Sequence, residues 1–334
     1  MRIILDAMGT DDHPRAEIAG AVEALLESES DVEIVLVGDR EIIEAELATY
    51  ESLPDCLTVF HAPDRVTGTD SPSKAIRRKP ESSIVVGLKL HRDGEADAFV
   101  SAGPTGAVMA TSLFTLRPLP GVDRPAVGAL LPTASEPCLL VDAGANVDCR
   151  PQHLVQFAQL GSIYARDMMG RPEPRVALLS IGEEPGKGDE LTLAAHRLLS
   201  SQRGLRFVGN VEGRDIIDGV CDVVVCDGFV GNVLLKFYES VFHFVVGLLK
   251  EELDSATENS LDFEEVFRVL DYAEIGGAPL LGVGGVTVIC HGESRPKAIR
   301  NALKLAVRAV RADMVGNSAR HLAESMDLPS REAS

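Results

Sequence analysis

Short runs of β-branched and aliphatic residues recur along the chain, separated by stretches whose apolar residues follow helical spacing. The runs that we expect to form strands are Ile3–Leu5, Val32–Val37, Leu57–Phe60, Ala98–Ser101, Leu139–Asp142, Val176–Ile181, Asp222–Cys226 and Val286–Cys290. After Pro14, the residues Ile18, Val22 and Leu25 predict a first helix. The alternation predicts a three-layer α/β protein in which helices cover both faces of a mostly parallel sheet.

The length of 334 residues suits one large α/β domain or two closely joined ones. We assign residues 1–315 to one α/β domain and residues 316–334, where the sequence turns polar, to a C-terminal tail. Apolar residues at helical spacing over 234–249, and again over 263–270, predict two amphipathic helices joined by a polar loop. These helices could pack on the core, on a second subunit or on a membrane surface.

Composition limits the core and the partners. Hydrophobic residues make up 45% of the chain, tryptophan is absent and aromatic residues contribute 4%, so we expect an aliphatic core. That composition suits buried parallel strands. The net charge of −19 argues against a nucleic-acid partner, because duplex binding requires clustered lysine and arginine. The same charge gives no electrostatic attraction to anionic lipid.

The cysteines and the apolar stretches bear on location. The six cysteines show no CxxC motif and no cysteine and histidine spacing suited to zinc, so we expect reduced thiols and no metal site. No apolar stretch followed by a cleavage site precedes the first strand. The longest apolar stretch, Val241–Leu249, is far shorter than the ~20 residues of a spanning helix. We therefore expect a cytoplasmic protein.

Glycine, aspartate, serine and asparagine gather where five of the expected strands end. These stretches are Asp6–Gly9, Ser101–Gly103, Asp142–Asn146, Gly182–Glu184 and Cys226–Gly228. In an open α/β sheet, ligands bind outside the carboxyl ends of the strands, where helix N-termini present N–H groups to an anion. We therefore expect the five loops to converge on one cleft. The alternative is that these residues only terminate strands and cap helices.

Several standard catalytic motifs are missing from the sequence. There is no GxxxxGK[ST] phosphate loop, and no GxGxxG opens a helix after the first strand, which disfavours a nucleotide cofactor. Neither a GxSxG elbow nor a cysteine with an evident histidine base provides a nucleophile for covalent acyl transfer. A reaction that works by positioning two substrates fits better.

An ordered set of segments carries a specific likeness. The segments are Asp6–Gly9, Ser101–Ala107, Arg124–Ala126, Asp142–Asn146, Ile181–Glu184, Lys187–Gly188, Glu212–Asp215, Cys226–Val233, Gly276–Val283, His291–Gly292, Ala298–Ile299 and Asn301–Ala302. Read in order, they resemble the phosphate acyltransferases of bacterial phospholipid synthesis, the PlsX family. The resemblance implies a fold similar to the isocitrate dehydrogenase and phosphotransacetylase group. It implies transfer of a fatty acyl group from acyl-carrier protein to inorganic phosphate, without a cofactor, for phosphatidic acid synthesis.

The resemblance also implies a homodimer, with the helical pair at about 234–272 protruding toward dimer contacts and the inner face of the membrane. A contact with the downstream acylglycerol-phosphate acyltransferase would be compatible with that location. Three positions depart from the family pattern: Pro104 replaces a usual asparagine, Thr10 a usual glycine and Glu293 a usual serine. Because Pro104 brings neither a side-chain amide nor a backbone N–H, we assign it no polar role.

The implied reaction places a phosphate dianion beside a thioester carbonyl on which negative charge develops, so the site needs cations and hydrogen-bond donors. We assign Lys187 to phosphate binding or carbonyl polarisation, and Asn232 to donation toward the oxyanion or phosphate. His291 would protonate the leaving thiolate. Each residue also has a plainer interpretation, as a solvated loop lysine, a helix cap and a structural histidine respectively.

Arg124 and Arg214 are further candidates for phosphate, because a guanidinium can donate two parallel hydrogen bonds. Each also has an adjacent carboxylate that could pair with it instead. The remaining candidates for substrate binding, taken from the matching loops, are Asp6, Gly9, Ser101, Gly103, Thr105, Gly106, Asn146, Asp227, Gly228 and Gly231.

Other functions stay open at this point. The chain could be a phosphotransacetylase that uses short acyl-CoA, or a non-catalytic scaffold that recruits carrier protein and has no need of Lys187 and Asn232. A decarboxylating dehydrogenase is disfavoured, because the four tyrosines lie outside the strand-end motifs. Docking of an acidic carrier protein would require a local basic patch, for which the candidates are Lys74, Arg77, Arg78 and Lys79.

Overall fold

The computed structural model describes residues 1–28, 31–255 and 276–327, in which eleven strands form one sheet with the order β3-β2-β1-β4-β11-β10-β5-β6-β9-β7-β8. The strands are β1 (Arg2–Asp6), β2 (Glu33–Gly38), β3 (Leu57–His61), β4 (Ala98–Ser101), β5 (Ala126–Leu131), β6 (Cys138–Val141), β7 (Val176–Leu179), β8 (Phe207–Val211), β9 (Val223–Val225), β10 (Ala278–Leu281) and β11 (Val286–Ile289). The helices are α1 (Arg15–Glu27), α2 (Arg40–Leu47), α3 (Pro72–Arg78), α4 (Ser83–Arg92), α5 (Thr105–Leu116), α6 (Pro151–Met168), α7 (Glu190–Ser201), α8 (Gly213–Ile217), α9 (Gly228–Ser255), α12 (Pro296–Arg311) and α13 (Met314–Asp327).

Two parallel sets of strands make up the sheet and run in opposite directions. β3, β2, β1, β4 and β11 form the first set, and β6, β9, β7 and β8 form the second. Between them, β11–β10, β10–β5 and β5–β6 pair antiparallel. Three reversals leave the carboxyl ends of the two sets pointing opposite ways. The mostly parallel fold is therefore confirmed, and the five strand-end loops divide between two opposite edges of the sheet. Their convergence on one cleft stays a prediction.

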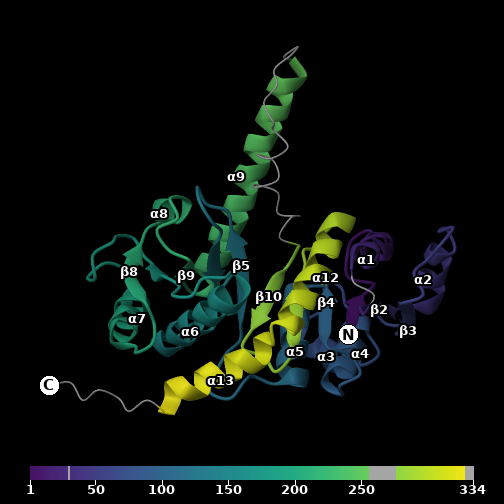
Figure 1. Ribbon diagram of the computed structural model, residues 1–334, viewed down its shortest axis with the longest axis horizontal. Coiled ribbons are helices and arrows are strands. Elements are labelled where there is room, and N and C mark those ends of the chain that lie inside the picture. Colours follow the sequence, from purple (N-terminus) through teal and green to yellow (C-terminus); the bar gives the residue numbers. More distant parts are fainter. Residues whose placement is uncertain (29–30, 256–275, 328–334) are drawn as a thin grey trace.

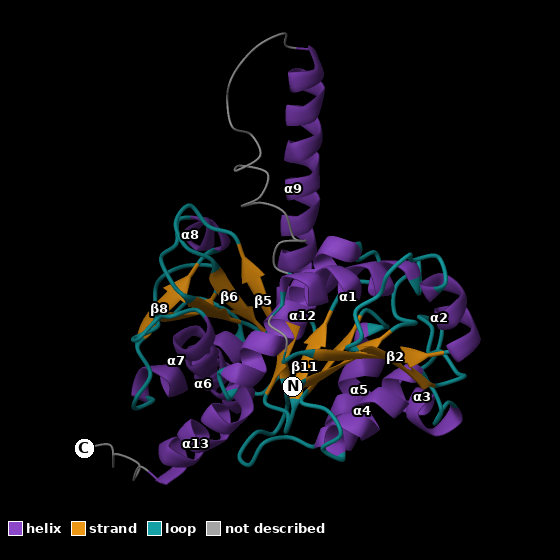
Figure 2. Cartoon of the chain, turned by 45° about the vertical axis from the view of Figure 1, so that its right-hand side comes forward, coloured by secondary structure: helices purple, strands orange, loops and turns teal. Residues whose placement is uncertain are grey.

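Helices cover both faces of the sheet, as expected (Figure 2). On one face, α1, α6, α7, α12 and α13 bury apolar side chains in a cluster that runs across both strand sets. On the other face, α4, α5 and α8 pack with the first turns of α9. Because successive strand side chains alternate between faces, each strand feeds both clusters: Ile3 and Leu5 lie in the first, and Ile4 lies in the second.

Helix α9 stands off the body of the molecule (Figure 1). The predicted helix over 234–249 is confirmed, although it begins earlier, at Gly228, and continues to Ser255. Its outer part exposes Phe237 and Phe244, each 65% accessible. Contrary to the expectation from the sequence, the segment Gly228–Leu248 is long and apolar enough to cross a membrane by length and composition alone. The second predicted helix, over 263–270, lies outside the described residues.

The C-terminal region corrects one prediction. Residues 314–327 form helix α13, in which Met314, Ser318 and Leu322 recur every fourth residue and are buried. This stripe packs against α6. The prediction of a polar tail from residue 316 is therefore wrong as far as residue 327, because a narrow apolar stripe is enough to dock an otherwise polar helix.

Candidate functional site

The expected site residues fall into two groups of loops, one at the carboxyl ends of each parallel set. The Asp6 group consists of residues 6–13, 101–107 and 291–293, next to β1, β4 and β11. The Lys187 group consists of residues 124–126, 142–150, 180–189, 210–215 and 226–232, next to β5, β6, β7, β8 and β9. In the part of the chain that the structure describes, hydrogen bonds and ion pairs join loops within each group, and none crosses between the groups.

Buried side chains hold the Asp6 group together. The Asp6 carboxylate accepts a hydrogen bond of 2.6 Å from the Ser101 hydroxyl and one of 3.1 Å from the Met8 N–H. The Ser101 oxygen in turn accepts the Gly103 N–H, and the backbone of Gly9 lies against that of Gly103. Burial raises the pKa of Asp6, and the bond from Ser101 opposes that rise. Asp6 and Ser101 therefore act on the shape of the loops, and any ligand would meet the backbone that they fix.

Glu17 and Arg65, which the sequence reasoning missed, brace the same loop. Both the N–H and the hydroxyl of Thr10 donate to the Glu17 carboxylate, at 2.7 and 2.9 Å. The guanidinium of Arg65 donates to the carbonyls of Met8 and Thr10, at 2.7 and 3.0 Å. Glu17 is fully buried, and burial raises its pKa to about 7. The available signal was Thr10 itself, a hydroxyl where the family has glycine.

The Asp6 group exposes few groups that could touch a ligand. Helix α5 begins at Thr105 and Gly106, both exposed, and its first N–H groups lack helical partners. The exposed His291 ring accepts the Glu293 N–H at Nδ1, at 3.2 Å. Because that N–H can only donate, the neutral ring carries its proton on Nε2. His291 therefore presents a donor to its surroundings.

In the Lys187 group, Asp142 is the buried centre. Its two carboxylate oxygens accept the N–H groups of Val127, Gly144, Ala145 and Asn146, at 2.7 to 3.2 Å. The Asn146 side-chain amide donates to the same carboxylate and to the Pro125 carbonyl. Burial raises the pKa of Asp142 despite these bonds. Asn146 is thus committed to holding two loops together.

The start of α9 is packed onto this loop. Asp227 accepts the N–H groups of Phe229 and Val230 and so caps the helix, while the Gly228 N–H donates to the Asn146 carbonyl at 2.7 Å. A Cβ at Gly231 would lie 1.9 Å from the Asp142 carbonyl oxygen, so the approach requires glycine. Asn232, one helical turn after Gly228, lies against Gly144. Since Asp227 is the cap, the capping interpretation of Asn232 is excluded.

The cations of the group differ in their surroundings. Arg214 is 71% exposed and lies among the carboxylates of Glu212, Asp215 and Glu183, at 3.2, 3.8 and 4.0 Å. Arg124 donates to the Asp148 carbonyl at 2.8 Å. Lys187 is exposed, and no carboxylate of the described residues lies within 4.0 Å of its ammonium. A phosphate would compete with fewer anions at Lys187 than at Arg214.

The cysteines beside the Lys187 group stay protonated. Burial, with Asp142 nearby, raises the pKa of Cys149 to about 11. Burial and the neighbouring carboxylate of Asp227 also raise the pKa of Cys226 well above the usual value. Since the thiolate is the nucleophilic form, neither thiol is poised to form an acyl intermediate at neutral pH. The arrangement favours direct transfer between two bound substrates.

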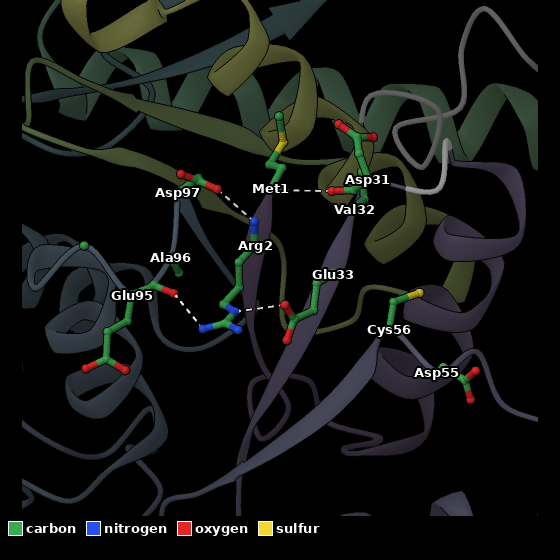
Figure 3. A pocket seen from close by; sticks show the side chains of 11 residues that line it. Met1, Arg2, Asp31, Val32, Glu33, Asp55, Cys56, Glu95, Ala96 and Asp97 are labelled. Carbon is green, nitrogen blue, oxygen red and sulfur yellow. Dashed lines mark hydrogen bonds and ion pairs between the residues drawn. The ribbon is translucent and has the colours of Figure 1, made fainter.

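A hollow of about 690 Å³ lies away from both groups, at the amino ends of β1 and β2 (Figure 3). Arg2 crosses it, with its N–H bonded to Asp97 and its guanidinium to Glu33 and to the Glu95 carbonyl. Its lining is rich in carboxylates, which repel a phosphate dianion. Among the described residues, no three histidines, cysteines, aspartates or glutamates are arranged to hold a metal ion.

The fold has counterparts among solved structures. A phosphotransacetylase from Streptococcus pyogenes superposes with a TM-score of 0.62 over 94% of each chain, at 17% identity. A putative 4-hydroxythreonine-4-phosphate dehydrogenase from Salmonella typhimurium superposes with a TM-score of 0.54 over 92% of this chain and 98% of that chain, at 12% identity. Identities this low show a shared fold and do not identify the reaction. The chain thus has the α/β fold of the phosphotransacetylases, as expected.

Sequence comparison gives the family. The model of the family described as fatty acid synthesis protein matches residues 1–316. A protein named phosphate acyltransferase, from Desulforamulus reducens, is 50% identical over 322 residues, which are 94% of this chain and 95% of that protein. The chain belongs to the fatty acid synthesis protein family, which confirms the family resemblance recognised in its loops.

Proposed function

We propose that the chain transfers a fatty acyl group from the thioester of acyl-carrier protein to inorganic phosphate and makes acyl phosphate for phosphatidic acid synthesis. Family membership and the relative's name, phosphate acyltransferase, support this reaction. A phosphate oxygen bonds to the carbonyl carbon, the carbon–sulfur bond breaks, and its electron pair leaves with the carrier's sulfur. Nothing is oxidised or reduced, so the reaction itself needs no redox cofactor.

The observation that carries this proposal is the exposed Lys187 in the loop after β7, together with the amide of Asn232 after the neighbouring strand β9. Among the described residues this amide has no hydrogen-bond partner. Lys187 would bind the phosphate dianion, and the Asn232 amide would donate to the oxygen of the thioester carbonyl as charge develops on it. The raised pKa values of Cys149 and Cys226 support direct attack by phosphate over an acyl-cysteine route.

His291 would donate its Nε2 proton to the departing sulfur. It belongs to the Asp6 group, so this role requires both groups to face one substrate. A thiol has a pKa of about 8.5, so its thiolate leaves readily without an acid. We therefore expect His291 to assist the reaction without being essential.

We further propose that the exposed apolar side of α9 joins two copies into a homodimer and brings the protein to the inner face of the membrane from the cytoplasm. Phe237, Val241, Phe244 and Leu248 are all at least 42% exposed, which supports a covered or lipid-facing position. A contact with the downstream acylglycerol-phosphate acyltransferase would also be compatible with this location. Light scattering tests the dimer and vesicle flotation tests the membrane contact, each with Phe237→Glu for comparison.

The experiment that tests the reaction incubates the purified protein with palmitoyl-carrier protein and inorganic phosphate and traps acyl phosphate with hydroxylamine. Phosphate-dependent hydroxamate that falls in both Lys187→Ala and Asn232→Ala supports the proposal. Product from acetyl-CoA but not from the carrier thioester would favour a phosphotransacetylase. A scaffold would be favoured if wild type made no product from either donor and the variant with both substitutions still recruited carrier protein to the membrane.

A further inference from the structure

One carbonyl group, that of Glu184, accepts two of the hydrogen bonds that hold the loop carrying Lys187. The Glu184 carbonyl oxygen accepts the Lys187 N–H and also the side-chain amide of Asn210, each at 3.0 Å. Asn210 lies in β8, on the strand next to β7, and is only 5% exposed. A buried amide from a neighbouring strand therefore fixes the turn from Glu184 to Lys187.

The partners of Asn210 determine which way its amide points. The Glu184 carbonyl can only accept, so the Asn210 atom facing it must be the nitrogen, Nδ2. The amide oxygen then faces His196 Nδ1 at 2.8 Å, so His196 must donate from that nitrogen. Both the neutral and the charged imidazole can donate there. The His196 ring also packs edge-on against Phe207, with 5.2 Å between ring centroids.

Lys187 is restrained from its other side as well. Its carbonyl accepts the Ser180 hydroxyl at 3.1 Å. Its side-chain stem lies over Gly182, where an added Cβ would be 2.9 Å from Lys187 Cγ. Because hydrogen bonds hold both the N–H and the carbonyl of Lys187, the backbone from which its side chain extends has a fixed position. A preorganised charge stabilises a transition state better than a charge that must be ordered during the reaction.

We infer that Asn210, oriented by His196, is a positioning residue that holds the Lys187 loop in the geometry needed to bind phosphate. The inference rests on the proposed function, because it assigns the phosphate to Lys187. It concerns a residue that touches neither substrate and acts through one backbone carbonyl. Loss of the Asn210 bond frees the turn, and the penalty should appear in the step that uses phosphate.

The test is a double-mutant cycle with Asn210→Ala and Lys187→Ala, in which rates are measured as inorganic phosphate and palmitoyl-carrier protein are varied separately. Asn210→Ala should lower kcat/KM for phosphate about tenfold, the equivalent of one net hydrogen bond, and leave KM for the carrier thioester unchanged. In the Lys187→Ala background it should cause no further loss, because the ammonium that Asn210 positions is gone. His196→Phe, which keeps a ring against Phe207, should cause a smaller loss of about threefold.

The matched control is Arg175→Ala, which removes a partly buried ion pair with Asp222 at the amino ends of β7 and β9. It should lower stability without a change specific to phosphate. If Asn210→Ala fails to fold, His196→Phe and its combination with Lys187→Ala complete the cycle. The inference would be overturned if the losses from Asn210→Ala and Lys187→Ala were additive, or if both Asn210→Ala and His196→Phe had an unchanged dependence on phosphate. A defective Lys187→Ala in that case would still leave the proposed function standing. A fully active Lys187→Ala would overturn this inference and the role of Lys187, whereas wild type that makes no acyl phosphate would overturn the proposed function.

Discussion

Both groups of strand-end loops are braced by a buried carboxylate, Asp6 or Asp142, and they differ in the cations that they expose. In the Asp6 group the carboxylates of Asp6 and Glu17 are buried, and with the half-buried Arg65 they bond to the loop itself. In the Lys187 group the cations Lys187 and Arg214 are exposed, and the bracing is done beneath them by buried groups. Buried charge thus shapes the backbone, whereas only exposed cations remain available to an anionic substrate.

The same comparison separates effects on stability from effects on activity. Removing a buried bracing group leaves hydrogen-bonding partners unsatisfied and should lower the free energy of unfolding. Removing an exposed cation costs little stability and should affect catalysis alone. Variants of buried bracing groups should therefore change unfolding measurements, and variants of exposed cations should change kinetic measurements.

The largest effect is expected at Asp142. Asp142→Ala leaves four backbone N–H groups and the Asn146 amide without their acceptor, and we expect a loss of about 5 kcal/mol of unfolding free energy, or no folded protein. Urea denaturation and soluble yield measure it. The matched control is Asp148→Ala, an exposed residue of the same loop, which should stay within about 0.5 kcal/mol of wild type. Equal stability of the two variants would remove Asp142 from its bracing role.

At Lys187 the expected effect is on rate. Lys187→Ala should lower kcat/KM about 10²–10³-fold, as loss of a donor to developing charge does in other enzymes, with its melting temperature close to that of wild type. Lys89→Ala, an exposed lysine near the other strand set, is the control and should retain full activity. A large fall in melting temperature for Lys187→Ala would contradict the division between the two groups.

Glu17 gives a pH-dependent effect. Its pKa rises from 4.5 to about 7 on folding, so between those pH values the folded chain holds a proton that the unfolded chain has lost. Stability from this group is greatest below pH 4.5, falls as pH rises and reaches its lowest level above 7, a change of about 3 kcal/mol. A glutamine side chain at this position can still accept the Thr10 N–H and donate to its hydroxyl.

We therefore expect Glu17→Gln to match wild type in unfolding free energy at pH 5 and to exceed it by as much as about 3 kcal/mol at pH 8. Urea denaturation at the two pH values tests this. Parallel pH profiles for the variant and wild type would show that Glu17 does not titrate as its burial implies.

The smallest effect concerns docking of the carrier protein. Of the predicted basic patch, Arg77 and Arg78 are exposed at the end of α3, Lys79 is paired with Asp70 at 2.7 Å, and the Lys74 side chain lies outside the described residues. Arg77→Glu with Arg78→Glu should raise KM for acyl-carrier protein about fivefold at low salt and leave KM for phosphate unchanged. Arg206→Glu, at a distant exposed site, is the control. Unchanged KM at low salt would rule out this patch.

The limits of sequence reasoning are clearest in the strands that it missed. β5 contains Gly128 and two alanines, β8 contains Gly209 at a positive φ of 105°, and β10 contains Pro279. Each of these residues weakens the usual pattern of a strand. β5 and β10 lie where the strand direction reverses, so their omission hid the division of the strand-end loops into two groups.

For the site, motif matching located the loops but could not separate exposed side chains from bracing ones. Asp6, Ser101 and Asn146 were expected to face substrate, and each has its side chain buried in hydrogen bonds. Glu17, Arg65 and Asn210 were missed, because their roles depend on partners that are distant in sequence or in another element. Spacing along a chain does not reveal such pairs.

The most direct test of the division between the groups is the affinity for inorganic phosphate, measured by ³¹P NMR titration of wild type, Lys187→Ala and Glu17→Gln at pH 7. We predict that wild type and Glu17→Gln bind phosphate alike and that Lys187→Ala binds it at least about tenfold more weakly, because the ammonium supplies the charge. Wild-type affinity in Lys187→Ala, or an equal loss in Glu17→Gln, would contradict the assignment of phosphate to the Lys187 group.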